Sequence, residues 1–168
     1  MREVIFEHAL ELFSEKGFAA ASMRELARRA NTTPSNVYNY FPSKEALLRQ
    51  VFAKGTAQIR ETLAAGGEGS DLRAYLTAVL RTVDEHPDLW RMIHQLRMNE
   101  DVQRILDPHF SEVLSDALRS LEAYTDEPWL LLAIVDGITA TRLQEMPQPT
   151  VEDIAYIVPR CLEALDDR

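Results

Sequence analysis

Apolar residues recur every three or four positions along most of the chain, which is the period of an amphipathic helix. The first such stripe holds Ile5, Ala9, Leu12 and Phe13. Gly17 follows it and is a typical residue to end a helix, because glycine tolerates a left-handed backbone. No stretch of the sequence shows the strict alternation of a half-buried strand. The pattern therefore predicts a protein built from helices.

Two short helices are predicted next, with only a three-residue break between them. Ser22 is placed to cap the first one, and Glu25 completes a capping box with it. Thr33 is placed to cap the second, since Pro34 suits the first position of a helix. Pro42 ends the pair. This spacing is typical of a helix-turn-helix, although many helical proteins also contain short helix pairs.

Six further helices follow from the same periodicity. The fourth helix opens at Ser43, and a glycine-rich loop at 66–70 separates it from the fifth. Pro128 opens the eighth helix, which is apolar nearly all round, and Thr150 caps the ninth. The six predicted segments lie at 43–59, 72–86, 89–96, 107–121, 128–143 and 150–165.

Composition narrows the class of protein. The 168 residues are 46% hydrophobic and 27% charged, which excludes wholesale disorder. The longest apolar run, Trp129 to Val135, is far shorter than the roughly 20 residues that cross a bilayer, and no signal-peptide pattern precedes the first helix. We expect a cytoplasmic protein without a membrane partner. A single cysteine and scattered histidines predict no disulfide, no metal site and no cofactor.

Charge is distributed unevenly along the chain. The net charge is −9, but residues 1–54 carry eight basic and six acidic side chains, so the remainder is strongly acidic. A locally basic segment on an acidic body can still dock one face on phosphates. The charge pattern therefore predicts that the first third of the chain makes any contact with nucleic acid.

The second short helix has an unusual surface. With Pro34, Val37 and Phe41 assigned to packing, its remaining side chains form hydrogen bonds and none is acidic. An ordinary exposed helix favours Glu and Lys, so a solvated helix with incidental polar residues is the less attractive alternative. Predicted base or near-base contacts are Thr33, Ser35, Asn36 and Asn39. Predicted phosphate contacts are Tyr38, Tyr40, Lys44 and the helix end at Ser22.

The same region carries a longer pattern. It includes Phe13, Gly17-Phe18, Ser22-Met23-Arg24-Glu25-Leu26-Ala27, and Ser35 through Leu48. This pattern resembles the N-terminal DNA-binding domain of the TetR family of transcriptional regulators, with Tyr38, Phe41, Lys44 and Leu47 at the family's positions. Asn31-Thr32-Thr33 stands where the family often has Ala-Gly-Val, and Tyr40 where it often has His.

The resemblance implies a two-domain, all-α protein. Residues 1–46 would form a three-helix DNA-binding domain, and residues 47–168 a helical ligand-binding and dimerisation bundle. Such a protein would bind a palindromic operator in double-stranded DNA as a homodimer. It would most often act as a repressor that an unidentified small-molecule effector releases. The alternative is a helix-turn-helix protein without an effector, acting as a constitutive DNA binder or a protein-interaction module.

Two further sets of residues are candidates within the regulatory domain. Bulky or polarisable side chains could line an effector pocket, although such residues are more often simply core. They are Tyr75, Trp90, Met92, His94, Met98, Phe110 and Trp129. Apolar side chains of the last two predicted helices could form a dimer interface, or alternatively fill a monomer core. They are Leu131, Ile134, Val135, Ile138, Ile154, Ile157, Val158, Cys161 and Leu165.

Catalysis is not expected. The four histidines His8, His86, His94 and His109 are scattered, and no carboxylate pattern near them suggests a triad or a metal site. Cys161 lies on an amphipathic stripe, which is typical of a core or interface position. We therefore predict that the protein is not an enzyme.

Overall fold

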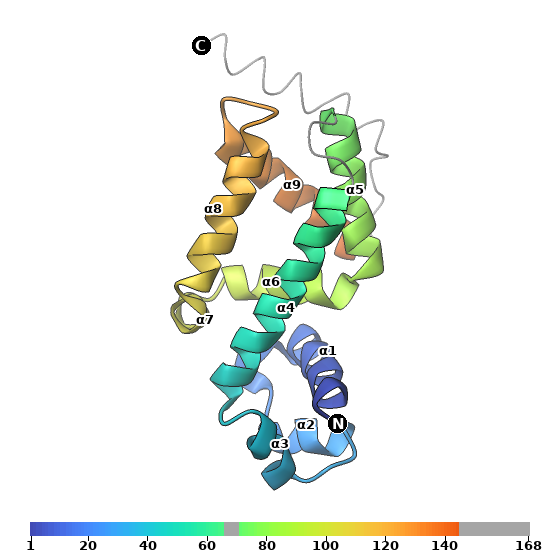
Figure 1. The fold of residues 1–168 in the computed structure, drawn as a ribbon, viewed down its shortest axis with the longest axis vertical. Helices are drawn as coiled ribbons and strands as arrows, with labels where there is room; N and C mark the ends of the chain where they lie inside the picture. Colours follow the sequence, from blue (N-terminus) through green and yellow to red (C-terminus); the bar gives the residue numbers. More distant parts are fainter. Residues whose placement is uncertain (66–70, 145–168) are drawn as a thin grey trace. The chain divides into compact units, whose positions relative to one another are not determined.

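The computed structural model describes residues 1–65 and 71–144, and all regular elements in these ranges are helices (Figure 1). They are α1 (Arg2–Ala20), α2 (Met23–Arg29), α3 (Pro34–Tyr40), α4 (Lys44–Ala65), α5 (Leu72–Glu85), α6 (Pro87–Arg97), α7 (Glu100–Leu106), α8 (His109–Leu121) and α9 (Pro128–Leu143). The predicted all-α fold is confirmed. The predicted loop at 66–70 and the predicted helix at 150–165 lie outside the described residues, and so do the interface candidates Ile154, Ile157, Val158, Cys161 and Leu165.

The predicted caps form, with one exception. The Ser22 hydroxyl accepts a hydrogen bond from the Glu25 amide at 3.2 Å, and the Thr33 hydroxyl accepts one from the Asn36 amide at 3.2 Å. The exception is the second half of the capping box, because the Glu25 carboxylate accepts its hydrogen bond from Lys16. A cap whose glutamate faces a lysine of another helix loses the reciprocal contact with the cap amide.

Several boundaries differ from the sequence prediction: α4 continues to Ala65 instead of ending near residue 59, α6 begins at Pro87 instead of 89, and α8 begins at His109 instead of 107. Gly17 has φ +75° and breaks the regular path of α1, as predicted, but one more turn follows it to Ala20. The prediction also missed α7. Asn99 caps that helix by accepting a hydrogen bond from the Val102 amide at 3.2 Å. Helix α7 has only seven residues, so its apolar residues Val102, Ile105 and Leu106 cover too short a stretch to establish a period.

The first compact unit consists of Met1–Ala57 and Asp88–Phe110. Within it α1 packs on α2, and α2 packs on α3. Figure 1 shows these three helices grouped together, with α4 leading away from α3. Of the three predicted packing residues, Val37 and Phe41 are fully buried, which confirms their assignment, whereas Pro34 is exposed, so its assignment to packing was wrong. The largest side chains of this core include Phe13, Leu26, Phe41, Leu47, Leu48, Phe52, Leu89, Met92 and Leu106.

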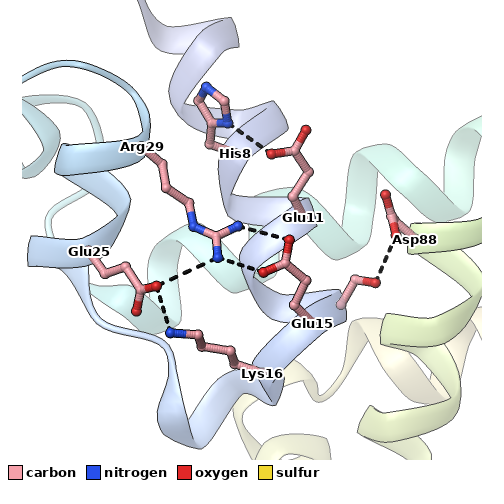
Figure 2. Close-up of polar contacts among 8 residues, drawn as sticks. His8, Glu11, Glu15, Lys16, Glu25, Arg29 and Asp88 are labelled. Atoms are coloured by element: carbon pink, nitrogen blue, oxygen red, sulfur yellow. Dashed lines mark hydrogen bonds and ion pairs between the residues drawn. The ribbon is translucent and has the colours of Figure 1, made fainter.

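Helix α6 holds α1 inside this unit. The Ser14 hydroxyl donates to Asp88 at 3.0 Å (Figure 2). The Gln95 side-chain amide donates to the Ser14 carbonyl at 2.8 Å. Because Gly17 breaks α1 directly after this point, the last carbonyls before the break need partners from outside the helix. Gln95 supplies one of them.

The second compact unit takes Gln58–Pro87 and the chain from Ser111 onward. Here α5 packs on α9. Arg142 donates to both carboxylate oxygens of Asp84, each at 2.6 Å, and the rings of Tyr75 and Tyr124 lie 5.2 Å apart. The two units are defined by packing alone. The boundary after residue 46, between the predicted DNA-binding and regulatory domains, stays a prediction. Within residues 1–65 and 71–144, no helix has both the length and the apolar character needed to span a membrane.

Candidate DNA-binding site

The turn between α2 and α3 is tight and well defined. Asn31 has φ +49°, a left-handed conformation that asparagine tolerates better than most residues. The Thr32 amide then donates to the Ala27 carbonyl at 2.9 Å, so the chain reverses against the last turn of α2. With the Thr33 cap starting α3 directly afterwards, the predicted helix-turn-helix is confirmed.

Helix α3 buries one residue and exposes the rest of its surface. Val37 alone in α3 is buried, whereas Tyr38 is 50% exposed and Tyr40 is 40% exposed. Thr33, Ser35 and Asn39 are also exposed, and Asn36 is half-buried. The structure thus brings these predicted contact residues onto one short helix and its cap, where a groove could receive them. Ser22 is exposed at the start of α2.

Asn36 is oriented by the turn. Its side-chain amide nitrogen donates to the Thr32 hydroxyl at 2.8 Å. Asn pairs with the edge of adenine through both its oxygen and its nitrogen, so the direction of this amide matters for recognition. Thr32, which the sequence analysis did not select, therefore sets how Asn36 is presented.

Two arginines that the sequence analysis did not select adjoin this surface. Arg24 and Arg28 are exposed, lie one turn apart on α2, and line an open hollow of about 560 Å³ together with Asn31, Thr32, Thr33 and Pro34. Neither guanidinium has an ion-pair partner in the described part of the chain. Their four-residue spacing, on the side of α2 opposite the buried Leu26 and Ala27, was the available sequence signal.

The other cations near α2 are paired. Arg29 donates to both carboxylate oxygens of Glu15, at 3.0 and 2.5 Å, and Lys16 donates to Glu25 at 2.7 Å (Figure 2). The hydrogen bond from Arg29 lowers the pKa of Glu15, and the one from Lys16 lowers the pKa of Glu25. These ion pairs join α1 to α2, and they leave the unpaired positive charge of α2 on the side of Arg24 and Arg28.

Lys44 has protein partners at the start of α4. Its ammonium donates to the carbonyls of Phe18, Ala21 and Ala19 at 2.8, 2.9 and 3.4 Å. The nitrogen also lies 4.4 Å from the centre of the Phe18 ring. The predicted contact of Lys44 with a phosphate remains a prediction. In this structure the side chain instead contacts backbone carbonyls and the Phe18 ring.

Comparison with known proteins agrees with this geometry. The family model described as "Bacterial regulatory proteins, tetR family" matches residues 5–51, which span most of α1, all of α2 and α3, and the beginning of α4. Residues 5–51 of this chain thus form a DNA-binding segment of the TetR type. The resemblance seen in the sequence is thereby confirmed.

Two curated relatives are named as HTH-type transcription factors. The HTH-type transcriptional regulator YuxN of Bacillus subtilis (strain 168) is 29% identical over 160 residues, covering 86% of this chain and 54% of YuxN. The HTH-type transcriptional repressor DhaR of Mycobacterium sp. (strain GP1) is 24% identical over 90 residues, covering 50% of this chain and 46% of DhaR. The chain spans about half the length of the curated relatives it matches.

Solved structures share the TetR fold over nearly the whole chain. A TetR-like transcriptional regulator from Rhodococcus sp. RHA1 has a TM-score of 0.73 at 22% identity, covering 93% of this chain and 90% of that one. The multidrug binding protein EbrR, solved with imidazole, has a TM-score of 0.71 at 20% identity, covering 96% and 89%. The relatives of this chain named here are transcriptional regulators, which agrees with the prediction of a protein that is not an enzyme.

The predicted pocket residues are spread over both compact units. Trp90, Met92, His94, Met98 and Phe110 belong to the first unit, and Tyr75 and Trp129 to the second. Met92 is fully buried, whereas Met98 is 88% exposed and Trp129 is 62% exposed. A hollow of about 280 Å³ in the first unit has a different lining, namely Arg49, Ala53, Leu106, Asp107, Pro108 and His109. The pocket assignment stays a prediction.

The predicted dimer residues on α9 divide into two groups. Leu131 and Val135 are buried within their own unit, and Ile134 and Ile138 are half-buried. The exposed side of α9 instead carries Trp129, Ala133 and Gly137 at four-residue spacing. A side chain added at Gly137 would meet no atom within 4 Å. If α9 contacts a second copy, this side is the accessible one.

Proposed function

We propose that this protein is a DNA-binding regulator of transcription that represses its target genes. The observation that carries the proposal is the surface of α3, which is polar, free of acidic residues and flanked by Arg24 and Arg28 of α2, two arginines with no ion pair among the described residues. A helix that reads the major groove needs donors and acceptors for base edges and cations for the neighbouring phosphates. The name of the relative DhaR, a repressor, favours repression.

The contacts divide into two kinds. Thr33, Ser35, Asn36 and Asn39 are proposed to reach base edges, because their short side chains lie at the start and along the open side of α3. Hydroxyl and cationic groups around them are proposed to bind phosphate oxygens and to set the position of α3 in the groove. These groups belong to Arg24, Arg28, Tyr38 and Tyr40, and the Ser22 end of α2 adds its backbone amides. Lys44, the remaining predicted phosphate contact, donates to backbone carbonyls in this structure.

A homodimer would present two copies of α3 to DNA. Recognition helices of such dimers lie roughly 34 Å apart, one turn of DNA, so the operator is proposed to be a palindrome. The open apolar side of α9 supports self-association, since a helix apolar nearly all round leaves Trp129 and Ala133 in contact with water in the single chain. Residues 1–46 would form the DNA-binding domain and residues 47–168 the regulatory one.

A small-molecule effector is proposed to release the operator. The structural relative EbrR is named a multidrug binding protein and was solved with imidazole, which supports a ligand-binding role for the helices beyond α4. An effector controls DNA affinity only if it binds the two conformations unequally. Bacterial promoters lie in the cytoplasm, and we place the protein there.

The decisive experiment is a DNA-binding titration of the full chain. Purified protein is titrated against DNA from upstream of its own gene and against an unrelated fragment of equal length, each over a series of salt concentrations. A regulator gives a palindromic footprint, a steep salt slope and a preference of about 10³-fold or more for one fragment. If the upstream fragment and random-sequence pools of DNA bind equally weakly, the result contradicts the proposal and favours a protein-interaction module.

A further inference from the structure

Lys44 joins the two ends of the helix-turn-helix. The segment from the Ser22 cap to Tyr40 is preceded directly by Ala21 and followed closely by Lys44 at the start of α4. The Lys44 ammonium donates to the Ala21 carbonyl at 2.9 Å, although the two residues are 23 positions apart. The entry into α2 and the exit from α3 are thereby held together by one side chain.

The partners of Lys44 are groups that need a cation. Carbonyls in the last turn of a helix have no partner within the helix, and here the Gly17 break leaves only the short turn Phe18–Ala20 after it. An ammonium has three donors, and the carbonyls of Phe18, Ala19 and Ala21 match them in number. The Phe18 ring and the negative end of α1 add favourable electrostatic contacts.

We infer that Lys44 is a positioning residue for DNA recognition, which holds α3 in place through the α1 carbonyls and not through a phosphate. This inference rests on the proposed function. Only Phe41, Pro42 and Ser43 separate α3 from Lys44, and Phe41 is fully buried, so a fixed Lys44 leaves the end of α3 little freedom. Removing the ammonium would free the α1–α2 junction from the α3–α4 junction while the apolar core still holds the fold.

The test compares Lys44→Met with Arg28→Met. Methionine keeps an unbranched apolar stem but has no donor. Arg28 is the matched cation because it is exposed on α2 and forms no ion pair within residues 1–65 and 71–144. Both variants, confirmed as folded by circular dichroism, are titrated against a duplex that the wild-type protein selects from a random-sequence pool and against an unrelated duplex.

Lys44→Met is expected to weaken binding of the selected duplex about tenfold, while the affinity for the unrelated duplex and the salt slope stay unchanged. Arg28→Met is expected to flatten the salt slope by about one unit on both duplexes. Lys44→Arg is expected to restore part of the loss.

Two results would overturn the inference. One is a Lys44→Met protein that loses about one unit of salt slope on both duplexes, as a direct phosphate contact would. The other is a Lys44→Met protein with unchanged affinity for the selected duplex.

A second measurement applies if Lys44→Met does not fold. In the wild-type protein, the nitrogen-15 signal of the Lys44 ammonium should show slow proton exchange with water and should stay unchanged when the selected duplex is added. A signal that changes to that of a phosphate-bound ammonium would refute the inference. If the wild-type protein selects no duplex, the proposed function fails, and the ammonium signal in the free protein still decides whether the α1 carbonyls hold Lys44.

Discussion

Gly55 marks a close approach between two helices of the first unit. A Cβ atom added at Gly55 on α4 would lie 2.3 Å from Cδ1 and 3.2 Å from Cγ of Leu89 on α6. Leu89 is 1% exposed, so its side chain has no free space into which it could turn. The absent side chain at Gly55 is therefore what permits this packing.

Replacement of Gly55 by alanine is expected to destabilise the protein. Overpacking of a core costs about 1–3 kcal/mol, and the better helix propensity of alanine returns at most about 1 kcal/mol. The free energy of unfolding, measured with urea, should fall. Gly137→Ala is the matched control, because nothing lies within 4 Å of its added Cβ, and it should raise the unfolding midpoint. A Gly55→Ala protein as stable as the control would show that the core yields at Leu89.

Asn36 and Thr32 are joined by a hydrogen bond. Their effect on the preference for one base pair can be measured separately from their effect on overall DNA affinity. Asn36→Ala is expected to cost about 1–3 kcal/mol at one base pair of the operator and to relax the preference there. Thr32→Val removes the acceptor that orients the Asn36 amide, so a smaller loss is expected at the same base pair. Competition binding against operators with single substitutions measures both. Losses at different base pairs would disprove the pairing.

At the scale of elements, α2 presents two kinds of arginine. Arg24 is exposed and unpaired in the described part of the chain, whereas Arg29 is held by Glu15 and Glu25 of the α1–α2 ion pairs. Arg24→Gln is expected to flatten the salt slope of DNA binding by about one unit without changing the unfolding midpoint. Arg29→Gln is expected to leave the slope unchanged and to lower the midpoint. Identical salt slopes for Arg24→Gln and the wild type would remove Arg24 from the interface.

The contact between α5 and α9 depends on pH in a known direction. The hydrogen bonds from Arg142 lower the pKa of Asp84 below its ordinary value. A carboxyl with a lowered folded pKa stabilises the protein above its unfolded pKa of about 3.9, and this stabilisation is lost as the pH falls through the lower, folded value. The side chains are partly exposed, so the contribution is at most about 1 kcal/mol. Asp84→Asn should therefore be less stable than the wild type at pH 7, and the two should converge below about pH 4. A difference that persists at pH 2 would contradict this account.

The elements were largely predictable because caps and apolar periods are local signals. The capping residues Ser22 and Thr33, with Pro34, predicted where α2 and α3 begin. The assignment of Val37 and Phe41 to packing predicted which side of α3 is exposed and polar. Helix α7 was not predicted, because its seven residues are too few for the apolar period of Val102, Ile105 and Leu106 to stand out. The partners of Lys44 could not be predicted either, because three backbone carbonyls near Gly17 carry no sequence signal of their own.

At the scale of the whole molecule, self-association is the property most open to test. Ala133 lies on the exposed side of α9 between Trp129 and Gly137, so a glutamate there should leave the single chain folded. In a dimer that uses this side it would place a charge in an apolar contact. Ala133→Glu is expected to sediment as a monomer with unchanged helix content, while Ala123→Glu, at another exposed position, should behave as the wild type. An Ala133→Glu dimer would exclude this side of α9.

The first compact unit is discontinuous, and this affects how far the protein can be recombined. Ser14 of α1 depends on Asp88 and Gln95 of α6, which the chain reaches only after α5. A hybrid gene that joins residues 1–46 to the sensor of another regulator would present α1 with a foreign side chain in place of Gln95. Hybrids that keep α6 together with the first helices should preserve the DNA-binding part of the protein. Natural exchange of sensor domains between such genes is limited by the same dependence of α1 on α6.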